Sequence, residues 1–159
     1  MTIRAVASTE PPLLERPLNA PLDLEQILET LREYQGADVT YEVDTYWDLW
    51  QFDEDWVLAP ARVLLSCFGP DFDNGTDRDA VEQEDLRVDF GLESQFLPQR
   101  GIAGSAKLVE SNIRSLLRLV HEIENTVPVV KRLLETESSE NFAERLREVL
   151  EPTGPLGTV

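Results

Sequence analysis

The chain has few cationic residues for its size. Its 159 residues hold only 14 Lys and Arg against 31 Asp and Glu, so the formal net charge is −17. The charged fraction of 28% is ordinary for a globular protein, and the acidity therefore comes from missing bases. Such a charge argues against direct binding to nucleic acid phosphates or anionic lipid. It permits binding to basic proteins or cations, or imitation of the charge of a nucleic acid.

Cysteine and histidine are equally scarce. The single cysteine, Cys67, excludes an intrachain disulfide, and its place in the apolar run 63–68 predicts a small buried side chain. His121 is the only histidine, so no second histidine is present to complete a usual zinc site. The spacing around it also does not indicate a histidine-based catalytic triad. The chain therefore offers no recognisable catalytic residue, which favours a non-enzymatic protein.

Long apolar runs and nucleotide-binding motifs are also missing. No stretch reaches the ~20 apolar residues of a membrane span, and residues 1–15 have no apolar core of signal-peptide length, so we expect a cytoplasmic protein without a membrane segment. The segment 101–107 places glycines, Ser105 and Lys107 before a helix, but it lacks the spacing of a phosphate-binding loop. We interpret it as a turn with Ser105 as the N-cap.

What the chain does have is a concentrated acidic segment. Residues 38–98 hold sixteen acids and three arginines, a net charge of −13, and they include all three tryptophans. Charge needed only for solubility would be spread along the chain. Its concentration among aromatic residues predicts an interaction surface.

Proline and hydrophobic periodicity divide the chain into three parts. Four prolines and no periodicity over residues 1–22 predict a flexible N-terminal arm, and residues 152–159 predict a flexible tail. The segment 23–151 between them is expected to form a single domain.

Within this domain the pattern changes from helix to strand and back. A helix is expected over residues 24–34 with Asp23 as its N-cap. Period-two alternation predicts strands over 39–49, 56–68 and 86–96, with the second strand bent or divided at Pro60. Three helices should follow. The first covers 105–123, the second begins near 126–128, and the third is capped by Ser138 or Ser139 and extends to residue 150. This order predicts a two-layer α+β domain with an antiparallel meander of three or four strands, preceded by one helix and followed by three.

The loop 71–82 is the nearest approach to a metal-binding motif. Calcium prefers six to eight oxygen ligands, and an EF-hand loop supplies them at fixed positions. Five acids match positions 1, 3, 7, 9 and 12, but the glycine stands at position 5 instead of 6. A calcium site is therefore a hypothesis beside the simpler one of a solvated acidic loop. The five acids are Asp71, Asp73, Asp77, Asp79 and Glu82.

The strand over 39–49 carries the candidate partner-binding residues. Its odd positions are apolar and should face the core, whereas Tyr46 and Trp50 project from the other face among acids. Three interpretations are open. A helix or a second protomer covers this face, a bend exchanges the two faces, or the aromatic residues are exposed and bind a partner. The predicted partner-binding residues are Asp44, Tyr46, Asp48 and Trp50.

These observations favour a non-enzymatic acidic protein that binds a basic protein, as an inhibitor, immunity protein, chaperone or nucleic-acid mimic does. One alternative is a calcium-dependent protein or hydrolase that uses the loop 71–82. Another is a structural subunit whose aromatic face is a homodimer seam.

Overall fold

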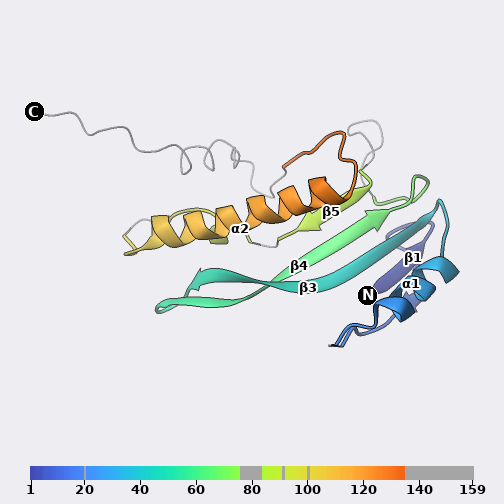
Figure 1. Ribbon diagram of the computed structural model, residues 1–159, viewed down its shortest axis with the longest axis horizontal. Helices are drawn as coiled ribbons and strands as arrows, with labels where there is room; N and C mark the ends of the chain where they lie inside the picture. The colour runs from blue at the N-terminus through green and yellow to red at the C-terminus, as the bar shows by residue number, and fades with distance from the viewer. Residues whose placement is uncertain (20, 76–83, 91, 100, 135–159) are drawn as a thin grey trace, which may run out of the picture. The chain divides into compact units, whose positions relative to one another are not determined.

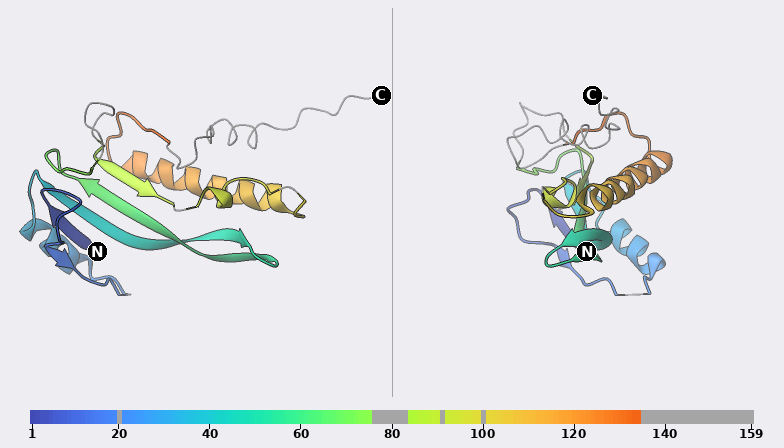
Figure 2. Two further views of the ribbon diagram at one scale, coloured as in Figure 1. Left: turned by 180° about the vertical axis from the view of Figure 1, so that it is seen from behind. Right: turned by 90° about the vertical axis from the view of Figure 1, so that its left-hand side faces the viewer.

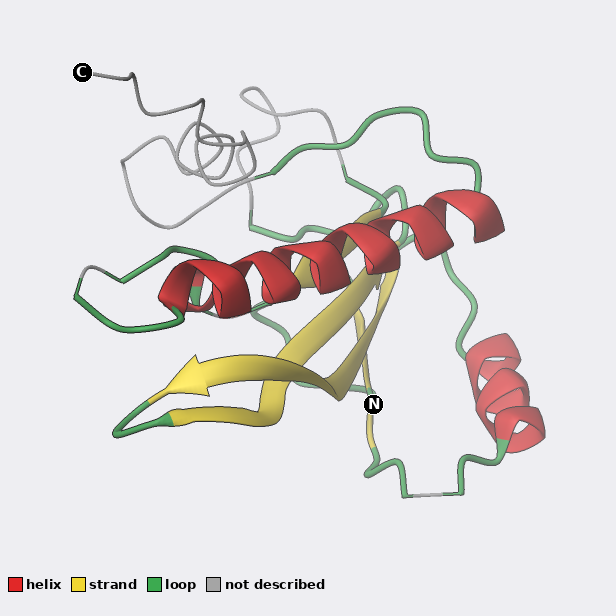
Figure 3. Cartoon of the chain, turned by 60° about the vertical axis from the view of Figure 1, so that its left-hand side comes forward, coloured by secondary structure: helices red, strands yellow, loops and turns green. Residues whose placement is uncertain are grey.

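The computed structural model describes residues 1–19, 21–75, 84–90, 92–99 and 101–134. These residues contain five β-strands, two α-helices and one 3₁₀ helix (Figures 1 and 3). In chain order the elements are β1 (Thr2–Ala5), β2 (Leu14–Glu15), α1 (Leu24–Glu33), β3 (Val39–Phe52), β4 (Trp56–Phe68), β5 (Leu86–Asp89), η1 (Glu93–Gln95) and α2 (Ser105–Thr126).

The five strands form one antiparallel sheet with the order β2-β1-β3-β4-β5. The α+β class and the antiparallel meander are confirmed, since β3, β4 and β5 are consecutive neighbours. The expected three or four strands become five because β1 and β2 extend the sheet beyond β3.

The chain divides into two compact units. Unit 1 comprises Met1–Trp47 and Ala61–Gly91, and unit 2 comprises Asp48–Pro60 and Leu92–Val159. Both β3 and β4 pass from one unit into the other, and a turn over residues 53–55 joins them (Figure 2).

In unit 1, helix α1 packs on the odd-numbered side chains of β3. Met1, Ile3 and Val39 form a buried cluster, against which α1 packs Ile27 and Leu31. The carboxylate of Asp23 accepts a hydrogen bond from the Gln26 amide at 3.0 Å, which confirms the expected N-cap. The prediction that odd positions of β3 face a core is therefore confirmed for Val39, Tyr41 and Val43.

The first fifteen residues contain two strands, although their sequence predicts a flexible arm. Ile3 is fully buried, and its carbonyl accepts a hydrogen bond from the amide of Leu13, just before β2, at 2.8 Å. Strands of four and two residues are too short for period-two alternation to stand out, and the neighbouring prolines obscured them. Part of the predicted arm is thus paired into the sheet.

In unit 2, helix α2 supplies two of the five buried apolar side chains that the structure describes. Val109 and Ile113 on α2 are buried, as are Leu49 of β3 and Phe96 and Leu97 after η1. The helix begins at Ser105, but its N-cap is Gly104 in a left-handed conformation with φ of 78°. The predicted Ser105 cap is therefore wrong, and the Ser105 hydroxyl instead accepts a hydrogen bond from the Gln99 amide at 2.7 Å.

Two predictions about regular structure after residue 86 are wrong. The strand expected over 86–96 ends at Asp89 and is followed by η1. Beyond Asp89 the apolar residues do not share one buried face, since Leu92 is 65% exposed whereas Phe96 is buried. The helix expected from 126–128 is absent over residues 127–134. Val127 precedes Pro128 and is extended, as the clash with a following proline ring favours. The helix expected up to residue 150 and the tail 152–159 lie outside the described residues.

Val6, directly after β1, adopts an unfavourable backbone conformation. Its φ is 70°, and the Ala7 amide donates to the Ala5 carbonyl at 2.9 Å, which closes a strained γ-turn around Val6. A β-branched residue rarely has positive φ. Hydrogen bonds from the Val6 amide to Asp38 and from the Asp73 amide to the Val6 carbonyl hold this conformation in place.

We predict that Val6→Gly raises the free energy of unfolding by about 0.5–1 kcal/mol, since glycine removes the left-handed strain but loses some entropy on folding. Urea denaturation measures the change. Ala5→Gly, one residue earlier in regular β1, is the matched control and should lower stability by about 0.5–1 kcal/mol. Equal losses in both variants would contradict a strained turn at Val6.

Candidate interaction surface on strand β3

Tyr46 is the most exposed aromatic residue on β3. Its exposed fraction is 69%, and Asp44 and Asp48, two positions away on either side, are also exposed. The intervening Thr45 and Trp47 are half-buried, as period-two alternation requires. Asp44 and Tyr46 belong to unit 1, whereas Asp48 belongs to unit 2. The structure thus exposes three of the four predicted partner-binding residues.

Asp44 is paired with Arg62 of β4. The Asp44 carboxylate accepts hydrogen bonds from Nε and Nη2 of Arg62 at 2.5 and 3.1 Å. The hydrogen bond from Arg62 holds the pKa of Asp44 below its ordinary value, and the same bond raises the pKa of Arg62. Both side chains are more than half exposed, so water screens the pair and its contribution to stability is small.

Two further arginines of unit 1 lie beside carboxylates. Arg4 lies 3.6 Å from Glu42, and Arg87 pairs with Glu84 while its guanidinium lies 5.3 Å from the Phe68 ring centroid. The described strands themselves hold five acids and three arginines, and only four of the sixteen acids of residues 38–98 lie in these strands, so most of the acidic charge lies in the segments between them.

Trp50, the fourth predicted residue, has a structural role. It is half-buried, and its backbone amide donates to Oδ1 of Asn112 at 2.8 Å, while Nδ2 of Asn112 donates to its carbonyl at 2.8 Å. Nδ2 of Asn112 also donates to the Gln95 carbonyl at 2.8 Å. Asn112 on α2 thus bonds to β3 as the backbone of a neighbouring strand would. Sequence reasoning missed it because a single Asn within a helix has no distinguishing pattern.

The turn between β3 and β4 adds a second acidic region, within unit 2. Asp53, Glu54 and Asp55 are exposed there, and Val57 and Leu58 are exposed by 56% and 52%. Phe52 and Trp56 pack against each other with ring centroids 5.3 Å apart, and the Trp56 indole donates to the Ala103 carbonyl at 2.9 Å. Trp56 is therefore held by its own unit, and the exposed groups of this turn are carboxylates and aliphatic side chains.

The structure describes only part of the loop 71–82, for which the sequence suggested a calcium site. Asp71 and Asp73 are exposed, and the Asp73 carboxylate accepts a hydrogen bond from the Gly75 amide at 3.0 Å, which forms a local turn. Asp77, Asp79 and Glu82 lie outside the described residues. Among the residues that the structure does describe, no group of three or more His, Cys, Asp or Glu side chains could hold a metal ion. The calcium site stays a prediction.

Cys67 is exposed, and the prediction that it is buried is wrong. The buried positions of β4 change parity between Val63 and Ser66, which turns Cys67 outward. Neighbouring atoms still shield the sulfur from water and raise the pKa of the thiol, so it is mostly protonated at neutral pH. His121, on α2, is exposed. Neither residue shows the environment of a nucleophile or base.

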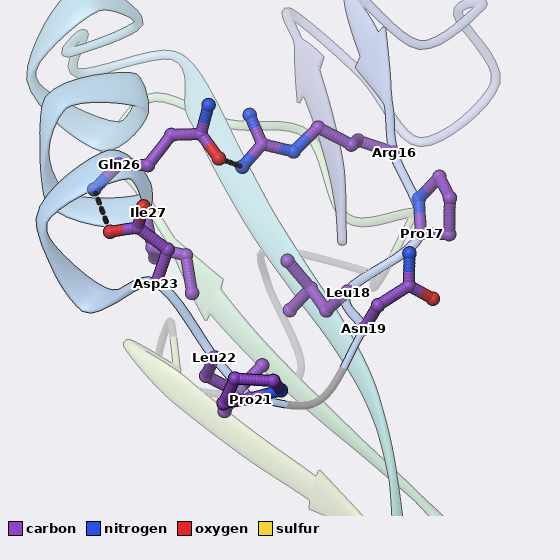
Figure 4. A pocket seen from close by; sticks show the side chains of 9 residues that line it. All are labelled: Arg16, Pro17, Leu18, Asn19, Pro21, Leu22, Asp23, Gln26 and Ile27. Atoms are coloured by element: carbon purple, nitrogen blue, oxygen red, sulfur yellow. Dashed lines mark hydrogen bonds between the residues drawn. The ribbon is translucent and has the colours of Figure 1, made fainter.

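A shallow groove of about 280 Å³ lies between the chain before α1 and the first turn of that helix (Figure 4). Nη2 of Arg16 donates to Oε1 of Gln26 across it at 2.9 Å, and the other lining residues are mainly proline and leucine. None of the predicted site residues lines it. The groove also lacks a cluster of acids or bases that would suggest catalysis.

No helix within the described part of the chain combines the length and apolarity needed to cross a membrane. Comparison of the chain with models of protein families, with curated proteins and with solved structures gives no match.

We predict that Asn112→Ala lowers the free energy of unfolding by about 2–3 kcal/mol, because it removes three hydrogen bonds and leaves backbone groups of Trp50 and Gln95 unpaired. Chemical denaturation measures the loss. Asn125→Ala, at an exposed position near the end of the same helix, is the control and should have little effect. A loss at position 112 no larger than that at 125 would contradict the bridging role.

Proposed function

We propose that this chain is a non-enzymatic interaction protein that binds a basic protein partner through β3. The observation that carries the proposal is Tyr46, exposed by 69% between the exposed carboxylates of Asp44 and Asp48. Tyrosine is enriched at the centre of interfaces because it offers a large contact area and a hydroxyl group at low entropic cost.

The charge of the surrounding chain supports a basic partner in particular. Residues 38–98 carry a net charge of −13, and the local arginines pair with only some of the acids. A field of this sign accelerates encounter with a positively charged surface, while the aromatic contact slows dissociation. The partner classes that fit are the target of an inhibitor or immunity protein, a chaperone client, or a protein whose nucleic-acid site this chain imitates.

The same charge weighs against the alternative of a homodimer seam on this face. Two copies would bring like charges together at Asp44 and Asp48, and the formal net charge of −17 on each copy adds long-range repulsion. We therefore favour a different, basic protein as the partner, in a cytoplasmic setting.

The proposal is tested by capture of a partner on the immobilised chain at low ionic strength, followed by affinity measurement with the purified partner. We predict that Asp44→Asn with Asp48→Asn weakens binding by about tenfold, chiefly through slower association. Tyr46→Ala should weaken it through faster dissociation, by about 1–2 kcal/mol.

The control removes two charges elsewhere, with Glu29→Gln and Glu33→Gln on exposed positions of α1. This variant changes the net charge equally but should retain most of the affinity. Failure to capture any basic protein, or equal weakening in both double variants, would contradict binding through β3.

A further inference from the structure

One edge of β3 is longer than the strand that covers it. β3 has fourteen residues, and on the β1 side its pairing extends only from Val39 to Glu42, opposite Ala5 to Thr2. The sheet order leaves no other described strand on this side of β3. Beyond Glu42, the described strands therefore leave this edge of β3 without a neighbour (Figure 1).

The printed hydrogen bonds show which backbone groups face that edge. The Asp38 carbonyl accepts from the Val6 amide, at the end of β1, whereas the Val39 carbonyl accepts from the Gly69 amide, just after β4. Even-numbered residues thus direct their amide and carbonyl groups toward the β1 side, and odd-numbered residues toward β4. Trp50, also even, gives both groups to Asn112 and not to β4, so the parity is maintained along the strand.

The backbone groups of Asp44 and Tyr46 therefore point to the part of this edge, within unit 1, that no described strand pairs with. An edge strand of this kind is a template for another strand, and proteins protect such edges with lysine, proline or bulges. Residues 43–47 contain neither lysine nor proline. Their only charged residue is Asp44, and an acid admits basic strands while it discourages a second copy of this acidic chain.

Building on the proposed function, we infer that the basic partner binds as an added β-strand along residues 43–47 of β3. An extended segment with alternating basic residues would exchange backbone hydrogen bonds with Asp44 and Tyr46. Its basic side chains would lie about 5 Å from the side chain of Asp44, within reach to displace the exposed Arg62. The side chain of Tyr46 would pack across this added strand. This explains why an exposed aromatic residue lies beside the part of the β3 edge that no described strand pairs with.

Amide hydrogen exchange resolved by NMR tests this mode, with a synthetic peptide of alternating lysine and threonine as the probe. In the free protein the amides of Asp44 and Tyr46 should exchange rapidly. Saturating peptide should slow both by about tenfold or more, while the Thr45 amide, which faces β4, is unchanged. A peptide with glutamate in place of lysine is the control and should give no protection.

Binding without protection of the Asp44 and Tyr46 amides would overturn strand addition and leave side-chain binding to the same face intact. Absence of peptide binding would overturn strand addition as well. Capture of a basic protein, together with the charge variants, tests the proposed function separately.

The variants Tyr46→Pro and Tyr46→Ala make a matched pair, because both remove the aromatic ring and only proline removes the outward amide. Proline should weaken peptide binding about tenfold more than alanine, and equal affinities would contradict the inference. If Tyr46→Pro fails to fold, the exchange measurement on the unaltered chain decides the question.

Discussion

Strand β3 has two faces and two edges over fourteen residues. The side chains on its faces must be packed or exposed to water, and the backbone groups along its edges need hydrogen-bond partners. In unit 1, α1 covers the odd-numbered face around Tyr41 and Val43, and β1 covers the edge as far as Glu42. In unit 2, Asn112 satisfies the backbone of Trp50. Among the described residues, the even-numbered side chains between Glu42 and Trp50 are exposed, and they are Asp44, Tyr46 and Asp48. The pairing of backbone groups along β3 therefore explains the fold and also shows where the candidate interaction surface lies.

Periodicity predicted the parts of the fold in which a pattern persists over many residues. The helix capped by Asp23, the long strand β3 and the helix after residue 104 all emerged from repeats of at least ten residues. Strands β1 and β2 were missed because four and two residues carry too little periodicity. The helix expected after Thr126 was wrong because the constraint of Pro128 on Val127 outweighed the apolar spacing.

For the candidate site, too, the sequence pattern predicted the exposure of some residues and not of others. Alternation placed Asp44, Tyr46 and Asp48 on one face, and each is exposed. Alternation alone does not distinguish Tyr46 from Trp50, because the difference depends on Asn112, which lies sixty-two residues after Trp50 along the chain. Cys67 was misplaced for a related reason: the buried face of β4 changes parity between Val63 and Ser66, and simple alternation cannot show such a change.

The central claim is that an acidic surface on β3 attracts a basic partner and that Tyr46 holds it. The most direct test is the association rate constant of the purified partner, measured by surface plasmon resonance from low to high ionic strength. The account predicts that association slows by about tenfold or more across this range, while dissociation changes little, since salt screens the long-range field and not the aromatic contact. An association rate that does not change with salt would contradict the claim.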